Sequence, residues 1–164
     1  MKSKLLFLIL FVGTCMVSYS QNLNLPKTPD LKKTGEAVQK TVVPSANMGN
    51  LVGELTSNLS DNALTDEFKK QKPGFTNETV KTTDPAGLGN SLATLSSGIK
   101  PGSMDAGWNA VKGKFVKDAK SAGSIKTVAG LAGQLESHIK PGSFKGSWGK
   151  ARPVWQNALQ TLSK

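Results

Sequence analysis

The side chains best suited to acid–base or metal chemistry are few in this sequence. His138 is the only histidine and Cys15 the only cysteine among 164 residues. A two-histidine metal site and a cysteine-based zinc cluster are therefore excluded, because each needs more ligands than the chain has. His138 comes at the end of an expected helix, where a charged imidazole is stabilised by the terminal carbonyls. The sequence suggests no nucleophile and orienting acid to accompany it, so we predict neither a catalytic nor a metal-binding role.

Carboxylate pairs are the other candidates for hydrolytic chemistry. A glycosidase needs two carboxylates across one cleft, and Asp66 with Glu67, or Glu54 with Asp61, are pairs that the sequence offers. Any soluble protein offers such pairs, and no Walker loop, GxSxG, HExxH or EF-hand pattern accompanies them. Residues 87–89 (Gly-Leu-Gly) do not follow a predicted strand, which excludes a dinucleotide-binding loop. We predict that the chain is not an enzyme and uses no cofactor.

Basic residues gather in the second half of the chain. The formal net charge is +10, and residues 21–87 balance at zero, whereas residues 88–164 hold 11 basic against 3 acidic residues. Four lysines between positions 112 and 120 form one basic cluster, and four basic residues between positions 140 and 152 form another. If these two basic clusters form one surface, it would suit nucleic acid, lipopolysaccharide or anionic lipid. We favour a solvated face instead, because no nucleic-acid-binding motif accompanies the charge. The candidate polyanion-binding residues are Lys112, Lys114, Lys117, Lys120, Lys140, Lys145, Lys150 and Arg152.

The three tryptophans, Trp108, Trp148 and Trp155, suggest either a stacking platform for sugars or bases, or a packed core. Trp108 and Trp148 are about 40 residues apart, which is a spacing typical of helical repeats. Residues that recur with an architecture usually fill its core, so we predict that the tryptophans are buried. The basic residue that recurs as Lys72, Lys112 and Arg152 is expected to cover these rings with its stem.

The first 20 residues have the pattern of a secretory signal peptide. Lys2 and Lys4 provide the charged start, Leu5–Val12 is an apolar run too short to span a bilayer, and we expect cleavage after Ser20. The ending resembles that of signals of Gram-negative bacteria. Cys15 follows a threonine where a lipoprotein signal prefers Gly or Ala, so lipid attachment is not favoured. The mature protein is expected to be periplasmic or secreted, with a net charge of +8 and no transmembrane segment.

A repeat of about 40 residues organises the remainder of the chain. The pentapeptide Ile99–Ser103 recurs as Ile139–Ser143, and apolar residues agree at the same offset in a diverged first copy. We predict a proline-containing tether with at most one short helix, followed by a domain over residues 47–164. The predicted segments are the tether over 21–46 and repeats over 47–86, 87–126 and 127–164.

Each repeat is expected to be a helical hairpin. In its first half, apolar residues recur three and four positions apart, as on one face of a helix. Asp84, which precedes a proline, and Ser124 are the expected N-caps. The Lys-Pro-Gly-Ser stretch is expected to end the first helix, with Gly in a left-handed turn and with Ser103 and Ser143 capping the next helical segment.

The second half of each repeat carries aromatic residues seven positions apart, which share one helix face. Because positions 73, 113 and 153 are Pro, Gly and Pro, we expect a kink or turn there. The predicted fold class is all-α, with three tandem helical-hairpin repeats of about 40 residues stacked into a small bundle or short solenoid. The expected core residues are Leu55, Leu59, Leu64, Phe68, Phe75, Leu95, Ile99, Met104, Trp108, Phe115, Leu135, Ile139, Phe144, Trp148 and Trp155.

The sequence supports three functional hypotheses. The first is a non-enzymatic protein with a binding or structural role in the bacterial cell envelope or exterior, which recognises a protein partner. The second is a binder of an acidic polymer through the two basic clusters, and the third is a hydrolase with an unrecognised carboxylate or His138 site. No oligomeric state is predicted. Small residues in the first helices, such as Gly89 and Ala93, favour close helix packing within the molecule.

Overall fold

The computed structural model describes residues 47–164, and every regular element in this range is helical, as predicted. No helix in this range is long and apolar enough to cross a membrane. The predicted signal peptide, Cys15 and the tether lie outside the described residues. The α-helices are α2 (Met48–Asn58), α3 (Asp66–Lys81), α4 (Pro85–Gly98), α5 (Trp108–Lys120), α6 (Ile125–His138) and α7 (Trp148–Leu162).

The first helix of each pair begins at a side-chain cap. The Asp84 carboxylate accepts a hydrogen bond of 2.7 Å from the Gly87 N–H, and the Ser124 hydroxyl accepts one of 3.1 Å from the Thr127 N–H. Both predicted N-caps are therefore confirmed. A third cap at Asn47 begins α2 in the same way, with an Oδ1 that accepts from the Gly49 N–H at 2.9 Å.

The connections within the helix pairs differ from the prediction. Each is a short 3₁₀ helix: η1 (Asp61–Ala63), η2 (Pro101–Ser103) and η3 (Pro141–Ser143). No left-handed glycine is needed, because the 3₁₀ turn itself reverses the chain. Ser103 and Ser143 do not cap the following helices. The Ser143 hydroxyl donates instead to the Ser103 carbonyl at 3.1 Å, which ties two of the connections together.

The second helices are continuous, so the predicted turn at positions 73, 113 and 153 is wrong. Pro73 lies inside α3, Gly113 inside α5 and Pro153 inside α7, and each helix continues through the position. A proline inside a helix removes one backbone hydrogen bond and costs about 3 kcal/mol. The helices continue because they place two aromatic side chains, seven residues apart, against the core on one face. The two rings of each such pair pack edge to face, as those of Trp148 and Trp155 do with their centroids 5.4 Å apart.

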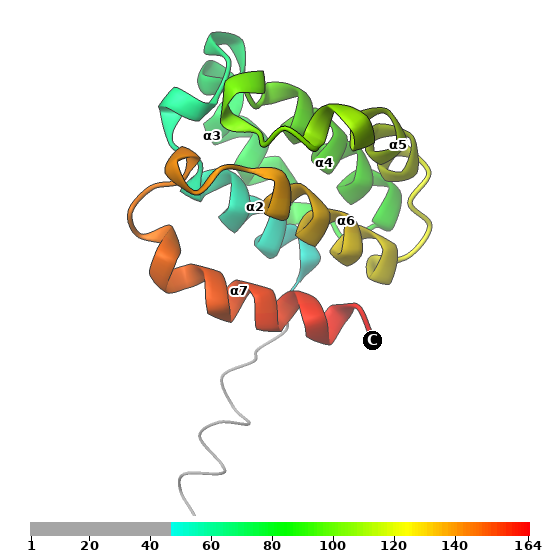
Figure 1. The fold of residues 1–164 in the computed structure, drawn as a ribbon. Helices are drawn as coiled ribbons and strands as arrows, with labels where there is room; N and C mark the ends of the chain where they lie inside the picture. Colours follow the sequence, from blue (N-terminus) through cyan, green and yellow to red (C-terminus); the bar gives the residue numbers. More distant parts are fainter. Residues whose placement is uncertain (1–46) are drawn as a thin grey trace, which may run out of the picture. The chain divides into compact units, whose positions relative to one another are not determined.

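The six helices form a closed arrangement (Figure 1). Helices α2, α4 and α6 contact one another at the centre. The helix pairs are α2 with α3, α4 with α5, and α6 with α7. The second helix of each pair packs on the first helix of its own pair and on the first helix of the next pair: α3 on α2 and α4, α5 on α4 and α6, and α7 on α6 and α2. The last helix pair therefore contacts the first.

Three backbone junctions hold this closure. Isolated antiparallel bridges join Leu64 to Ile99, Met104 to Ile139 and Leu59 to Phe144. Each junction has two N–H···O=C bonds of 2.8 to 2.9 Å, and the residues in equivalent bonds are separated by the offset of the sequence repeat. In each bond the first residue donates its backbone N–H and the second accepts with its carbonyl. The first junction has the bonds Lys100 to Ala63 and Thr65 to Gly98. The second has Lys140 to Ser103 and Asp105 to His138, and the third has Ser60 to Ser143 and Lys145 to Asn58.

The core fills the space between the central helices. All of the predicted core residues are buried except Phe75 and Phe144, which are half-buried and pack against the same cluster. Small residues allow the helices to approach closely. A Cβ on Gly89 would lie 2.0 Å from the Ala119 carbonyl oxygen, and one on Gly49 would lie 2.5 Å from that of Thr79.

Candidate ligand-binding groove

His138 belongs to a junction between helix pairs. Its Nδ1 lies 3.0 and 3.1 Å from the two carboxylate oxygens of Asp105, and its ring lies beside that of Trp108. Asp105 Oδ1 also accepts from the Trp108 N–H at 3.0 Å and so caps α5. The hydrogen bond from His138 holds the pKa of the Asp105 carboxyl below its usual range. The geometry therefore gives the single imidazole a structural partner.

We expect Asp105→Asn to lower the melting temperature at pH 7, because the amide keeps the helix cap but loses the charged partner of His138. The pKa of Asp105 is depressed in the folded state, so its contribution to stability is present above the ordinary aspartate pKa of about 3.9 and is lost as the pH falls through the lowered value. The difference in melting temperature between the two proteins should therefore shrink below about pH 4. Thermal scans at several pH values measure it, and a difference that stays constant with pH would contradict a stabilising role of the Asp105 charge.

The carboxylates singled out in the sequence do not face each other across a cleft. Asp66 forms an ion pair with Lys69 at 2.8 Å, which holds the pKa of its carboxyl below the usual range, and Asp61 lies 3.3 Å from the Lys72 ammonium. Glu54 and Glu67 are exposed on their helices. Within residues 47–164, no group of three or more His, Cys, Asp and Glu side chains is gathered closely enough to hold a metal ion.

Glu136 is a buried carboxylate that no sequence motif marks. Its side chain is 3% exposed, and its Oε1 lies 2.7 Å from the Nε of Arg152. Arg152 thus pairs with a carboxylate, and Lys72 donates to the Leu59 carbonyl at 2.7 Å. The positions that match Glu136 in the other helix pairs hold Thr56 and Ser96, which are also buried. A polar residue recurring at one buried position was the signal that could have found this pair.

All three tryptophans are buried. The Trp155 Nε1–H donates to the Leu51 carbonyl at 2.8 Å and so joins α7 to α2. The Trp148 Nε1 is buried and has no hydrogen-bond partner among the described residues. Trp148 lines a hollow of about 270 Å³ and Trp155 one of about 370 Å³, but both side chains are at least 96% buried.

The two indoles should respond differently to the same substitution. We expect Trp155→Phe to lower the free energy of unfolding by about 1–2 kcal/mol more than Trp148→Phe does, because only the first change breaks a hydrogen bond. The loss of ring volume is common to both variants and cancels in the difference. Urea unfolding of the two proteins measures the difference, and equal losses would contradict the assignment of the hydrogen bonds.

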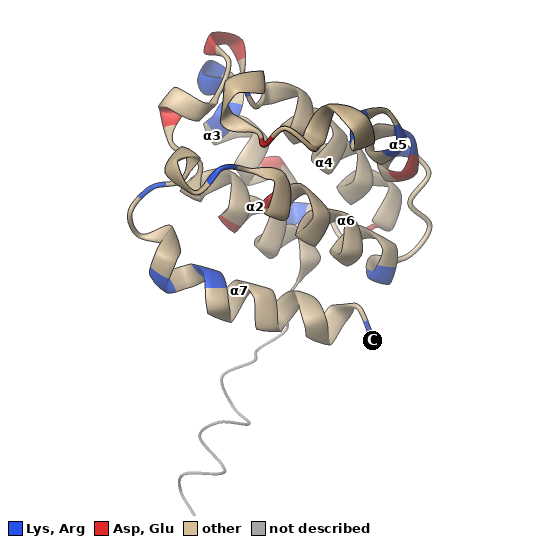
Figure 2. Cartoon of the chain, viewed as in Figure 1, with Lys and Arg blue, Asp and Glu red and all other residues tan. Residues whose placement is uncertain are grey.

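The eight candidate polyanion-binding residues are exposed, but they lie on separate parts of the bundle. In Figure 2 the blue segments of α5 are at the upper right and those at the start of α7 are at the lower left. Helix α5 packs on α4 and α6, whereas α7 packs on α6 and α2. Lys114 pairs with Asp118, and Lys140 donates to the Gly102 carbonyl at 2.9 Å. The two basic clusters thus belong to outer parts of the bundle that share one neighbouring helix, α6.

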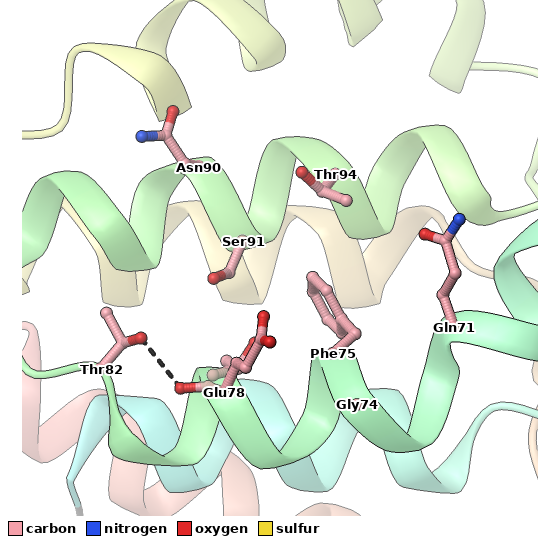
Figure 3. Close-up of a pocket in the computed structure, with 9 residues that line it drawn as sticks. Gln71, Gly74, Phe75, Glu78, Thr82, Asn90, Ser91 and Thr94 are labelled. Carbon is pink, nitrogen blue, oxygen red and sulfur yellow. Dashed lines mark hydrogen bonds between the residues drawn. The ribbon is translucent and has the colours of Figure 1, made fainter.

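A groove with a volume of about 580 Å³ lies between α3 and α4. We call it the α3–α4 groove. Figure 3 shows the Phe75 ring pointing from α3 toward α4, with Ser91 and Thr94 across from it. Further polar side chains line the groove: Gln71, Glu78 and Thr82 from α3 and its end, and Asn90 from α4.

The groove exists because one helix pair departs from the other two. At the positions that match Phe75, Phe115 and Trp155 are each only 1% exposed, whereas Phe75 is half-buried. In the other two pairs, the matching position of the next central helix is a buried leucine: Leu131 on α6, and Leu51 on α2, whose carbonyl accepts from the Trp155 indole. The matching position on α4 is Ser91. Its smaller side chain leaves the Phe75 ring partly open to solvent.

The groove continues over α4. A second hollow of about 450 Å³ between α4 and α5 is lined by Ser97, Val116 and Lys120, and it shares Asn90 and Thr94 with the first. The outer edge of α4 thus presents small, uncharged polar side chains to both hollows. The motifs and charge patterns of the sequence do not reveal this surface. The available signal was the serine at position 91, because positions 51 and 131, one repeat before and after it, hold leucine.

Comparison of the chain with protein-family models, curated proteins and solved structures finds no match.

Proposed function

We propose that this chain is an exported, non-enzymatic binding protein built from three helical-hairpin repeats, and that its ligand occupies the α3–α4 groove. The half-exposed Phe75 ring is the observation that carries the proposal. Burying an aromatic ring at this position stabilises the other two helix pairs, whereas here the ring is only partly buried and has polar side chains beside it. Ligand sites combine an apolar surface with a few placed polar groups, which is the composition of this groove.

Equivalent contacts at the spacing of the sequence repeat support the three-repeat organisation. The junction hydrogen bonds, the central helix caps and the paired aromatic rings all recur at this spacing. Contact between the last and first helix pairs favours a closed bundle over a short solenoid, because the repeats of a solenoid contact only their neighbours. Export is supported by the signal-peptide pattern of residues 1–20.

The two alternative functions receive less support from the same geometry. A hydrolase needs convergent acid–base groups, but Glu78 is the single carboxylate lining the groove and His138 is engaged by Asp105 in a junction. A polyanion binder needs convergent cations. One basic cluster lies on α5, and the other lies on α7 and the connection before it, and the two helices have only α6 as a shared neighbour.

Replacing Ser91 by leucine tests the proposal, because it restores the residue found at positions 51 and 131. The new side chain should cover Phe75, close the groove and stabilise the fold by about 1 kcal/mol through the apolar area it buries. The binding of three classes of probe is measured by calorimetry: neutral oligosaccharides, heparin and a tryptic digest of casein. We expect the unaltered chain to bind one class and Ser91→Leu to bind it at least about tenfold more weakly.

A matched control removes an apolar side chain away from the groove. Val154 on α7 is 72% exposed, and Val154→Ala should leave binding unchanged. If no class binds, or if Ser91→Leu binds as well as the unaltered chain, the α3–α4 groove is not the binding site.

A further inference from the structure

We infer that the ligand of the α3–α4 groove is an uncharged carbohydrate chain. This inference depends on the proposed function, since it names the ligand class of the same site. Three properties of the groove support it: an aromatic ring that is open on one side, a lining of hydroxyl and amide groups, and the near absence of charge among the lining residues.

The open ring provides the apolar contact that a sugar needs. An aromatic face carries partial negative charge, and the C–H groups of a sugar ring carry partial positive charge, so the two attract each other when they stack. The Phe75 ring is fixed for such contact, because it packs edge to face on the buried Phe68 with ring centroids 5.1 Å apart. Ser91, across the groove, leaves the space that a stacked sugar ring would fill.

Hydroxyl and amide groups line the groove, with Ser91 facing α3 and Asn90 pointing away from Phe75 toward the second hollow (Figure 3). The amides of Gln71 and Asn90 each offer donors and acceptors, and the hydroxyls of Ser91 and Thr94 offer further acceptors. The Ser91 hydroxyl donates to the Gly87 carbonyl at 3.1 Å, which leaves its oxygen free to accept from a ligand hydroxyl. Sugar hydroxyls both donate and accept, so they match a lining of this kind.

Charge separates a carbohydrate from the other ligand classes. Glu78 is the only charged residue that lines the α3–α4 groove, and its carboxylate would repel a phosphate or sulfate chain. The continuing hollow has one charged lining residue, Lys120 on α5. A single carboxylate accepts hydrogen bonds from sugar hydroxyls without requiring a charged partner.

The shape of the groove suits a chain more than a single sugar. Its lining runs along α3 from Gln71 to Thr82, which at the helical rise is about 16 Å. The second hollow shares Asn90 and Thr94 and extends the surface across α4 toward α5. A linear oligosaccharide could therefore contact both hollows, with Phe75 beneath one of its rings.

The test titrates cellohexaose, chitohexaose and maltohexaose, as neutral oligosaccharides, into the purified chain by calorimetry. We expect at least one to bind, with an affinity that changes less than about twofold between about 50 and 500 mM salt, because no counterions are released. Phe75→Ala and Ser91→Leu should each weaken binding at least about tenfold, and Val154→Ala should not. Glu78→Gln should change the affinity only a few-fold, since the amide still bonds to hydroxyls.

The other outcomes overturn the inference and separate it from the proposed function. Binding of casein peptides that Ser91→Leu abolishes would overturn the carbohydrate assignment and leave the groove as the binding site. Heparin binding that weakens steeply with salt and strengthens in Glu78→Gln would assign the groove to a polyanion. A failure of all three classes to bind would overturn both the inference and the proposed function.

Discussion

Among the glycines of residues 47–164, Gly89 is expected to be the most damaging to replace by alanine. The new Cβ would lie 2.0 Å from the Ala119 carbonyl oxygen and 3.0 Å from the Ala122 Cβ. The first of these atoms is backbone, so α5 as a whole must move away from α4. We expect a loss of about 3 kcal/mol or more in the free energy of unfolding, as for severe overpacking of a core, and a fall of about 10 °C or more in the melting temperature.

Gly130 provides the matched control for this substitution. It also lies inside a central helix, but a Cβ placed on it meets nothing within 4 Å. Alanine is favoured over glycine by about 1 kcal/mol in a helix, so Gly130→Ala should raise the melting temperature. Thermal unfolding of both variants measures the contrast. A shift of the same sign in the two proteins would contradict the close approach of α4 and α5.

The Arg152–Glu136 pair gives the second large effect. Removal of one partner of a buried ion pair leaves an uncompensated charge and commonly costs about 3–5 kcal/mol, although Arg152 is 46% exposed and solvent reduces this figure. We expect Arg152→Met to lower the free energy of unfolding by about 2–3 kcal/mol. Urea unfolding measures this as a lower midpoint with an unchanged slope.

A second substitution should rescue that variant. The position of Glu136 is occupied by Thr56 in the first helix pair, where the hydroxyl donates to the Val52 carbonyl at 2.8 Å. Glu136→Thr in the Arg152→Met background removes the unpaired carboxylate and supplies a group that its own helix can satisfy. We expect at least half of the lost stability to return. A double variant no more stable than Arg152→Met would show that the charge of Glu136 is not the cause of the loss.

Local features of this fold could be predicted from the sequence. Asp84 and Ser124 cap helices by bonds to residues three positions away, and the apolar spacing determines which face of each helix is buried. These properties depend on near neighbours in the chain. Phe68, Trp108 and Trp148 are predictable core residues for the same reason, since their recurrence marks one helix face.

Features that depend on distant residues could not be predicted in this way. Pro73 and Pro153 disfavour helix locally, and only the burial of aromatic rings on both sides of them outweighs this preference. The Glu136–Arg152 pair forms only because α7 packs on α6, and the Phe75 ring is partly exposed only because α4, which carries Ser91, packs on α3. Both therefore depend on which helices are neighbours. The order of helices around the bundle was not apparent from the repeat alone.

Closure of the bundle limits how many helix pairs it can hold. In an open array, a pair can be added or deleted at an end and the remaining contacts survive. Here α7 packs on α2, and the Ser60 N–H bonds to the Ser143 carbonyl near the other end of the domain. A fourth pair would have to break that junction, and loss of the third would leave two junctions unpaired. Duplication of a helix pair would therefore disrupt this domain. A circular permutation, in which the end of α7 is linked to the start of α2 and another connection between helices is opened, should leave the same contacts in place.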